Sequence, residues 1–368
     1  MIKVIHVISD TNIGGAGRSL LNCLRNFNKT ALTIKVILPK DSLLKPEIEK
    51  LSYQVIEIEG NKDKSFDWGA IKILRKIFKE EAPDIVHTHA SMSARVAAFL
   101  AGVRSRIYTR HCAFEPSKKL TIFPLKKLYG IFDDILTNRI IATAEVAKID
   151  LTRVGIKEDK IEVILNGVDA LTEYSNEDKL QIREKLGIKP DDFVVGIVAR
   201  LEENKGQKYF INAINLLRTK KIKGLIVGDG SARQLFLDQV IKLQLQDNII
   251  FTGFQNDVAP FMNIMDVNVN CSNLSETSCL SLSEGMSIKK PAIATACGGN
   301  PDMVHEGKNG FLIPVNDQNS LAESIEILMR DKELYNQMSE NAKKMYNEKF
   351  TAKVMTRAVE KIYKQERE

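Results

Sequence analysis

Short apolar runs alternate with longer segments of helical periodicity along most of the chain. Apolar runs of strand length, without polar alternation, are typical of strands that are buried on both faces. In the first half they predict strands at Lys3–Ile8, Thr33–Leu38, Val55–Ile58, Ile85–His89, Arg106–Thr109, Arg139–Ala142 and Glu162–Leu165. Helices are predicted between most of them, at Ala16–Asn26, Trp68–Glu80, Ser93–Ala101 and Ala144–Arg153. Such alternation predicts a parallel sheet with helices on both faces.

The alternation starts again after Asp169–Gly187, a polar segment that contains a charged helix. Here strands are predicted at Phe193–Val198, Gly224–Val227, Asn248–Phe251, Val267–Asn270 and Ala292–Ala294, and helices at Gln207–Arg218, Ala232–Leu243, Ser278–Ser287 and Leu321–Met329. The fold class is therefore α/β, with two Rossmann-like domains that face each other across a cleft. We place them at residues 1–170 and 171–350, and expect a helix within 351–368 to pack back on the first domain. Ligands of such sheets bind outside the carboxyl ends of the strands.

Composition narrows the class of protein. The chain has 368 residues, of which 44% are hydrophobic and 27% are charged, as in soluble globular proteins. The net charge of +6 comes without any basic-aromatic RNA-binding motif, so nucleic acid is not an expected partner. The five cysteines form no C-x-x-C pair, which fits reduced thiols and a cytoplasmic location. No apolar run approaches the roughly 18 residues of a bilayer span, so any membrane contact is expected to be peripheral.

The segment Ser117–Tyr129 mixes lysines with apolar residues. Two interpretations stay open. The segment could lie on the anionic inner face of the plasma membrane, near a lipid-linked or cell-envelope acceptor. It could equally be an ordinary surface helix with a loop.

Glycines follow the first predicted strand. Gly14 and Gly15 stand directly before a helix, where glycine allows close approach of a ligand and the helix N-terminus favours negative charge. A tight strand–helix turn is the alternative. The segment lacks the G-x-G-x-x-G spacing with a distal acidic residue, so a nicotinamide cofactor is not expected.

Two cations follow the first strand of the second domain. Arg200 and Lys205 are suited to a diphosphate, because arginine makes bidentate contacts and lysine adds a point charge. Solvated surface cations are the alternative.

Two glutamates flank a helix start in the segment Ser275–Gly285. Glu276 follows a strand, and Glu284 lies within the next helix, whose first turn near Cys279 and Leu280 offers backbone amides to a phosphate. Glu284 can accept hydrogen bonds from a ribose diol, and Glu276 can reach the hydroxyls of a donor sugar. A solvated helix face is the alternative.

Three histidines end strands of the first domain. His111 can hydrogen-bond a sugar hydroxyl or steady developing charge, although a structural histidine is the alternative. His87 and His89 point the same way from one strand, and we expect one of them to line the cleft. No further ligands are apparent near them, so no metal site is predicted.

The ordered set of motifs resembles the family-4 retaining glycosyltransferases of the GT-B class, over nearly the whole chain. The matching pieces are Gly14-Gly15, Pro83 to His89, His111, Asn166 to Asp169, Arg200 with Lys205-Gly206, Gly228 to Gly230, Gly253-Phe254 with Asp257, the E-x7-E pair Glu276 and Glu284, Gly298 to Asp302, and Asn309 to Leu312. Two departures concern the donor geometry. The family usually has Glu where Asp302 stands, and Ala-Met-Ala where Gly285-Met286-Ser287 stands.

The resemblance implies a function and a set of roles. Arg200 and Lys205 would hold the diphosphate of a nucleotide sugar, with UDP favoured, and Glu284 would bind its ribose. Glu276 and His111 would face the transferred sugar, while Gly15 would line the donor site, as would the Gly298-Gly299 turn. Transfer would go to a glycan or lipid-linked acceptor in cell-envelope polysaccharide synthesis, by a front-face route that retains the anomeric configuration. No Asp-x-Asp pair occurs, so no metal is expected to be required.

Two other functions share this architecture. A nucleotide-sugar 2-epimerase would interconvert a donor without an acceptor, and a non-catalytic protein would bind a nucleotide sugar or stabilise a true transferase. The E-x7-E pair with the Arg200 and Lys205 loop argues against the first. The presence of every charged site residue argues against the second.

Overall fold

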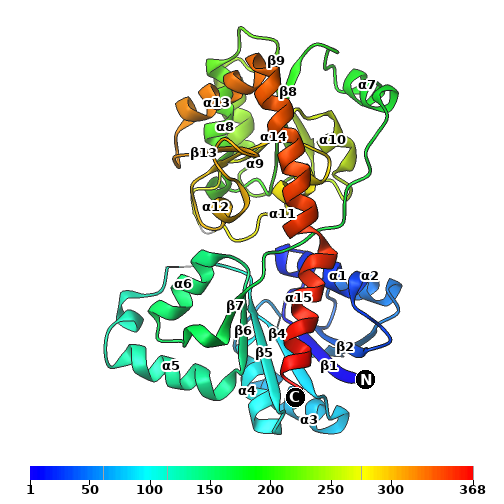
Figure 1. Cartoon of the computed structure of the whole chain (residues 1–368), viewed down its shortest axis with the longest axis vertical. Helices are drawn as coiled ribbons and strands as arrows, with labels where there is room; N and C mark the ends of the chain where they lie inside the picture. Colours follow the sequence, from blue (N-terminus) through cyan, green and yellow to red (C-terminus); the bar gives the residue numbers. More distant parts are fainter. Residues whose placement is uncertain (61, 114, 275, 368) are drawn as a thin grey trace. The chain divides into compact units, whose positions relative to one another are not determined.

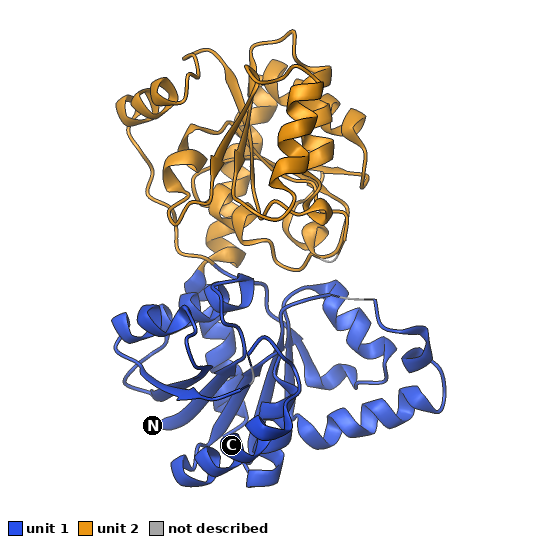
Figure 2. Ribbon diagram, turned by 180° about the vertical axis from the view of Figure 1, so that it is seen from behind, with its two compact units in different colours: residues 1–167, 352–368 blue, residues 168–351 orange. Residues whose placement is uncertain are grey.

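The computed structural model describes residues 1–60, 62–113, 115–274 and 276–367. The chain forms two compact units (Figure 2), unit 1 of Met1–Gly167 and Ala352–Glu368 and unit 2 of Val168–Thr351. The boundaries between the units thus lie within a few residues of the predicted ones at 170/171 and 350/351. Ser275, which opens the glutamate segment, and Glu368, which ends the chain, lie outside the described residues.

Unit 1 contains a seven-stranded sheet in the order β3-β2-β1-β4-β5-β6-β7, and its strand pairs are parallel (Figure 1). Its strands are β1 (Ile2–Ile8), β2 (Leu32–Pro39), β3 (Gln54–Ile58), β4 (Ile85–His89), β5 (Ser105–Arg110), β6 (Arg139–Ala142) and β7 (Ile161–Val163). Its helices are α1 (Gly15–Asn26), α2 (Leu44–Lys50), α3 (Trp68–Glu81), α4 (Met92–Ala101), η1 (Lys118–Thr121), α5 (Leu125–Leu136), α6 (Glu145–Arg153), η2 (Glu158–Lys160) and α15 (Ala352–Gln365).

Strand β1 shows why this sheet is covered on both faces. Val4 and Ile8 belong to the hydrophobic cluster that includes residues of α1, α2 and α15, whereas Ile5 and Val7 belong to the cluster with α3 and α4. Successive side chains of a strand point to opposite faces, so both sets must be apolar. His6 lies between Val4 and Ile8 in sequence and is 1% exposed, which makes it a polar group inside the first layer.

Unit 2 contains a six-stranded parallel sheet in the order β10-β9-β8-β11-β12-β13. Its strands are β8 (Phe193–Val198), β9 (Ile222–Val227), β10 (Ile249–Gly253), β11 (Val267–Asn270), β12 (Ala292–Thr295) and β13 (Gly310–Ile313). Its helices are α7 (Asn176–Lys185), η3 (Glu203–Lys205), α8 (Gln207–Leu216), α9 (Arg233–Lys242), α10 (Ala259–Ile264), α11 (Leu280–Ser287), α12 (Asn300–Met303), α13 (Gln318–Arg330), α14 (Lys332–Met345) and η4 (Tyr346–Phe350).

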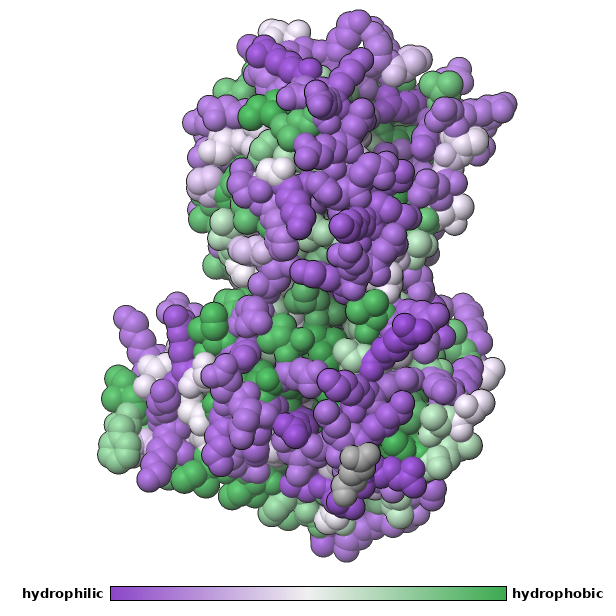
Figure 3. All heavy atoms as spheres, viewed as in Figure 1, coloured by the Kyte–Doolittle hydropathy of each residue, from purple (hydrophilic) through white to green (hydrophobic). Residues whose placement is uncertain are grey.

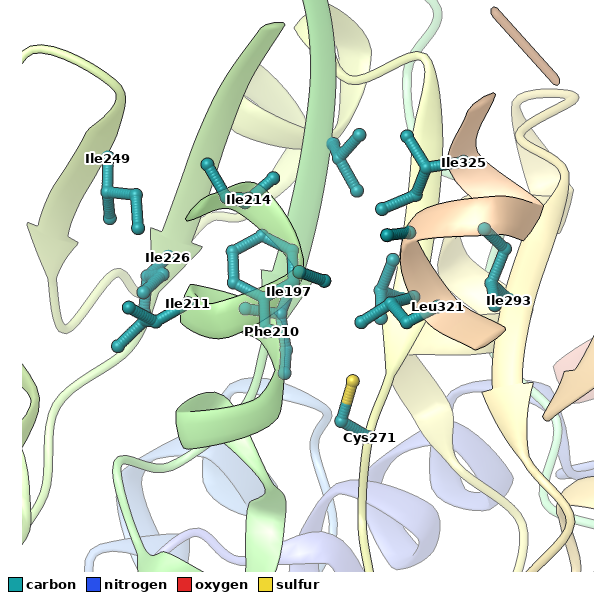
Figure 4. Packing of buried hydrophobic residues seen from close by; sticks show 14 of the residues in the cluster. Ile197, Phe210, Ile211, Ile214, Ile226, Ile249, Cys271, Ile293, Leu321 and Ile325 are labelled. Atoms are coloured by element: carbon teal, nitrogen blue, oxygen red, sulfur yellow. The ribbon is translucent and has the colours of Figure 1, made fainter. Parts of the chain in front are cut away.

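The larger hydrophobic cluster of unit 2 lies between its sheet and the helices α8, α9 and α13. Phe210 and Ile214 from α8 pack with Ile197 from β8 and Ile226 from β9, and each is at most 1% exposed (Figure 4). Leu321 of α13 is also fully buried in this cluster. The apolar stripe of each helix thus closes one face of the sheet, which leaves the loops at the strand ends outside the core.

The C-terminal helix α15 belongs to unit 1, where it lies beside α1 (Figure 1). Met355, Val359, Ile362 and Tyr363 recur at helical spacing and are all buried in the cluster that also holds residues of α1. Burial of four large side chains ties the end of the chain to the first sheet.

Several elements were not predicted from the sequence. They include β13, α2, α10, α12, α14 and the short η2, η3 and η4, most of which are short or polar. Within the described ranges, none of the helices has the length and apolar character that crossing a bilayer requires.

Candidate functional site

The loops of unit 2 meet at a topological switch point. From β8 the chain adds β9 and β10 on one side, and then returns to place β11 on the other side of β8. The loops that follow β8 and β11 therefore leave the same edge of the sheet in opposite directions. Open α/β sheets bind ligands in the crevice formed at such a point.

Lys205 and Glu276 form an ion pair at this edge. Lys205 ends η3 after β8, and Glu276 follows β11, so the pair joins the two loops at the switch point. The side chains are 18% and 12% exposed, and the Ser272 hydroxyl also donates to Glu276 Oε1 at 2.5 Å. The half-buried lysine can bind an anion, and the carboxylate next to it can accept a hydrogen bond from a neighbouring hydroxyl.

Two glycines hold the loops together. Gly206 has φ +73°, and a Cβ there would collide with the backbone oxygen of Cys271. Gly298, after β12, has φ +57° and faces the backbone oxygen of Glu276 in the same way. The Gly299 amide donates to that oxygen at 3.1 Å. Because only glycine fits both the conformation and the space, three loops can converge on Glu276.

Helix α11 begins beside this cluster. Its N-cap, Cys279, supplies no capping hydrogen bond from its side chain within the described part of the chain, whereas Asp317 caps α13. Instead the Cys279 Sγ accepts from Asn270 Nδ2 at 3.0 Å. Backbone amides in the first turn, from Leu280 onward, are thus not engaged by an N-cap side chain, and a phosphate is a suitable acceptor for them. Glu284 lies one turn further along the helix and is half-buried.

Arg200 stands apart from the ion pair. Its side chain is 72% exposed and bonds Glu202 Oε1 at 2.6 Å, while its backbone oxygen accepts from the buried Gln207 at 2.8 Å. The structure therefore brings Lys205 and Glu276 together, and places Arg200 on the same loop with its guanidinium in solvent.

Gly253 and Phe254 lie at the end of β10. Gly253 has φ +71° and open space where a Cβ would stand, and its oxygen accepts from the Gly228 amide at 2.9 Å. Phe254 is 65% exposed. An exposed aromatic ring beside open backbone is suited to a flat ring such as a nucleobase.

In unit 1, Gly14 and Gly15 also lie at a switch point, between β1 and β4. Both are exposed, nothing lies within 4 Å of a Cβ built on either, and Gly14 is the N-cap of α1 without a side-chain bond. This helix start therefore leaves room for a ligand to approach its backbone, and its role in binding stays a prediction.

The histidines of unit 1 form one cluster. His111, after β5, is half-buried and pairs with His89 Nδ1 through its Nε2 at 2.9 Å, and burial lowers its pKa to about 4. His87 and His89 are 2% and 5% exposed, so neither is an exposed lining residue. The expectation that no further ligand lies near them is wrong, because His6 Nδ1 is 3.0 Å from His89 Nε2. Ring nitrogens of His6, His87 and His89 lie within 4.8 Å of one another.

His6 escaped prediction because its partners depend on register. Strand β1 pairs with β4 so that His6 stands opposite His87, which alternation along one strand does not reveal. Tyr363 escaped for a similar reason, since it reaches the same cluster from the other end of the chain.

Comparisons with known proteins agree with this arrangement. The model of "Glycosyltransferase Family 4" matches residues 13–170, and that of "Glycosyl transferases group 1" matches residues 178–345. The UDP-Gal:alpha-D-GlcNAc-diphosphoundecaprenol alpha-1,3-galactosyltransferase of Escherichia coli is 32% identical over 288 residues, which cover 75% of this chain and 74% of that one. The capsular polysaccharide biosynthesis glycosyltransferase CapM of Staphylococcus aureus is 27% identical, with 78% of each chain covered.

Solved structures show the same fold. Anabaena Alr3699/HepE in complex with UDP superposes with a TM-score of 0.86 at 21% identity, covering 99% of this chain and 100% of that chain. Two Rossmann-like units with loops gathered at their switch points define the GT-B class. The chain belongs to family 4 of the glycosyltransferases and is a glycosyltransferase.

Proposed function

We propose that the protein transfers a sugar from a nucleotide diphosphate donor, with UDP favoured, to a glycan or lipid-linked acceptor, and retains the anomeric configuration. The observation that carries the proposal is the ion pair of Lys205 and Glu276 beside the N-terminus of α11 at the switch point of unit 2. The E. coli relative is named for a UDP-galactose donor and a lipid diphosphate acceptor, and CapM is named for capsular polysaccharide, which supports envelope synthesis as the setting.

The charge of each site residue indicates the part of the donor that it would bind. Lys205, Arg200 and the amides of α11 would neutralise the diphosphate as it leaves, which is the task of a metal ion in other transferases. Glu284 would accept hydrogen bonds from the ribose, and Glu276 would bind hydroxyls of the sugar. Unit 1 would contribute His111 as a hydrogen-bonding group for the sugar and Gly14-Gly15 as open backbone.

A transfer assay tests this proposal. Purified protein is incubated with UDP-hexoses or UDP-N-acetylhexosamines, a lipid-diphosphate-linked sugar as acceptor, and EDTA. We expect a glycosylated product whose new bond keeps the donor's anomeric configuration, read by NMR. Inversion at the anomeric carbon, a strict need for Mn²⁺ or Mg²⁺, or an isomerised donor without transfer would each contradict the proposal.

We propose that helix α5 and the residues just before it face the membrane that would hold the acceptor. Ile122, Phe123, Leu125, Leu128, Ile131, Phe132 and Ile135 are all exposed, and Phe123 is 77% exposed. Figure 3 shows apolar atoms along the lower left edge of unit 1, where Figure 1 places α5. Contiguous apolar patches on a soluble surface mark interaction sites.

The orientation of α5 strengthens this argument. Its buried side carries Asp133, which is 2% exposed and forms an ion pair with Arg95 of α4. The polar group thus faces inward while the apolar residues face solvent, the reverse of an ordinary surface helix. Lys118, Lys119, Lys126 and Lys127 are exposed around the apolar residues and match an anionic lipid surface.

Vesicle sedimentation tests the membrane contact. The protein should sediment with vesicles that contain anionic lipid, and the variant Phe123→Ser/Leu128→Ser should lose most of this binding. Leu216→Ser is the matched control, because Leu216 is 53% exposed on α8 of unit 2. Equal sedimentation of all three proteins, or none at low salt, would rule out α5 as the membrane face.

A further inference from the structure

Six side chains of unit 1 form a continuous line of hydrogen-bonding groups, which we call the histidine relay. They are Thr109, His87, Tyr363, His6, His89 and His111, in that order. In the first half of the relay, the distances are 2.6 Å from Thr109 Oγ1 to His87 Nε2 and 2.6 Å from His87 Nδ1 to Tyr363 Oη. Tyr363 Oη is in turn 3.2 Å from His6 Nε2. In the second half, the distances are 3.0 Å from His6 Nδ1 to His89 Nε2 and 2.9 Å from His89 Nδ1 to His111 Nε2. The relay joins strands β1, β4 and β5 to helix α15.

The imidazoles of the relay are neutral at pH 7. Burial lowers the pKa of His6 to about 3 and holds the pKa values of His87 and His89 well below their usual range. A neutral imidazole carries one N–H, which donates, and one bare nitrogen, which accepts. A ring that accepts a hydrogen bond through one nitrogen must therefore donate through the other, so the direction of one bond fixes the direction of the next.

Only two arrangements satisfy every bond. If Tyr363 donates to His6, then His6 and His89 must each donate from Nδ1, His111 carries its proton on Nδ1, and His87 donates from Nδ1 to Tyr363. If Tyr363 donates to His87, every bond reverses and all the protons sit on Nε2. In both arrangements the four histidines share one tautomer.

We propose that Tyr363, His6 and His89 are positioning residues that decide which ring nitrogen of His111 carries the proton, and that the relay changes direction only as a unit. This inference rests on the proposed role of His111 at the sugar. Because His111 bonds His89 through Nε2, its Nδ1 carries a proton in one arrangement and none in the other. Helix α15 would thus set the hydrogen-bonding character of a group that lies far away in sequence.

A metal ion is the competing occupant of His6, His87 and His89. The geometry favours the relay, because each of these rings already lies within hydrogen-bond distance of a partner through both nitrogens. The ring planes of His6 and His89 are also nearly parallel, at 18°, so the rings stack. Among the described residues that line the adjoining cavity none is a carboxylate, and its volume of about 20 Å³ suits one water molecule.

Nitrogen-15 NMR of histidine-labelled, full-length protein tests the relay directly, because protonated and bare ring nitrogens have distinct shifts. We expect His6, His87, His89 and His111 to show one shared tautomer. In Tyr363→Phe, the tautomer of His87 should no longer follow that of the other three histidines. Tyr53→Phe is the matched control, since its buried hydroxyl donates to Leu24 O at 2.7 Å, outside the relay. Different tautomers among the four, unchanged shifts in Tyr363→Phe, or one tightly bound metal ion per chain would overturn the proposal.

The other end of the relay gives a second variant. Thr109→Val removes the partner of His87 Nε2, and a buried N–H without a partner is rarer than a bare acceptor. We therefore expect all four histidines to move to the Nδ1–H tautomer together. A change confined to His87 would show that the relay does not act as a unit.

Kinetics separate this inference from the proposed function. Tyr363→Phe should lower kcat/KM for transfer about tenfold, the effect of one lost hydrogen bond, and leave UDP affinity unchanged. If the NMR result holds but the rate does not fall, the positioning role is wrong. If the unaltered protein transfers no sugar from any donor, the proposed function fails, while the tautomer measurement still decides whether the relay exists.

Discussion

At the scale of single residues, Gly285 accounts for a departure from the family pattern. It stands in α11 where the family usually has alanine, and a Cβ there would lie 2.7 Å from Nδ2 of Asn268. Asn268 is fully buried in β11 and donates to Ser281 O at 2.7 Å. The small residue in the helix and the polar residue in the strand therefore depend on each other.

Gly285→Ala should destabilise unit 2 by about 1–3 kcal/mol through overpacking. Gly15→Ala is the control, because a Cβ at Gly15 meets nothing within 4 Å. In thermal unfolding, Gly285→Ala combined with Asn268→Ala should lose less than the sum of the two single changes. Additive losses of stability would show that the two residues do not depend on each other.

The buried histidines predict acid sensitivity of unit 1. The pKa of His6 falls to about 3 and that of His111 to about 4, both below the unfolded value of 6.5. The unfolded chain therefore binds more protons below about pH 6.5, and each imidazole that stays neutral costs about 1.4 kcal/mol of stability per pH unit. Urea unfolding followed by Trp68 fluorescence should show a lower midpoint at pH 5 than at pH 7. Equal midpoints would mean that these histidines are charged in the folded protein.

How far the sequence reveals the site depends on the kind of contact. The loops that carry Lys205 and Glu276 could be placed, because each directly follows an apolar run and parallel strands end at one edge. Their ion pair could not be foreseen from spacing, since it depends on β11 lying next to β8. The contact of Arg200 with Glu202 is local, but charge alone did not show whether Arg200 pairs with Glu202 or joins Lys205 at the predicted diphosphate site.

At the scale of elements, helix α5 is held by a buried pair. Arg95 and Asp133 are 5% and 2% exposed, and Arg95 Nε also donates to Thr137 Oγ1 at 2.9 Å. The sequence showed the mixture of lysines and apolar residues, but not which side of the helix faces solvent. That orientation follows from the buried pair, because a charged Asp133 is stable inside only next to Arg95.

Asp133→Leu should destabilise unit 1 by about 3–5 kcal/mol, since it leaves the Arg95 charge buried without its partner. The double variant Arg95→Met/Asp133→Leu should recover most of this loss. Glu59→Ala, which breaks an exposed pair with Lys40 at 2.9 Å, should change little. Thermal unfolding of the four proteins measures the difference. A small effect of Asp133→Leu would show that α5 is held by other contacts.

At the scale of the whole molecule, the chain crosses between units twice. Unit 2 is continuous in sequence, whereas unit 1 is completed only by α15. The alternation of strands and helices revealed both sheets, and the amphipathic pattern of α15 predicted its return to the first domain. The pattern gave no signal for β13, because the run at Gly310–Ile313 begins with a glycine directly after a turn.

Ending the chain at Thr351 should therefore damage unit 1 alone. The truncation uncovers the surface where Met355, Val359 and Tyr363 are buried. Hydrogen exchange should show lost protection in β1 and β4 and unchanged protection in β8 and β11, while removal of residues 367–368 alone serves as the control. Equal loss of protection in both units would contradict the division into two separate hydrophobic cores.

The central claim is that Lys205 and the start of α11 bind a nucleotide diphosphate. Calorimetry with UDP in the presence of EDTA tests it most directly, with Lys208→Ala as control, because Lys208 is exposed on α8. We expect Lys205→Ala to weaken binding about 10- to 100-fold, the value of a charge-assisted contact, and Lys208→Ala to bind as the unaltered protein does. Unchanged UDP affinity in Lys205→Ala, or no binding of UDP without a divalent ion, would contradict the account.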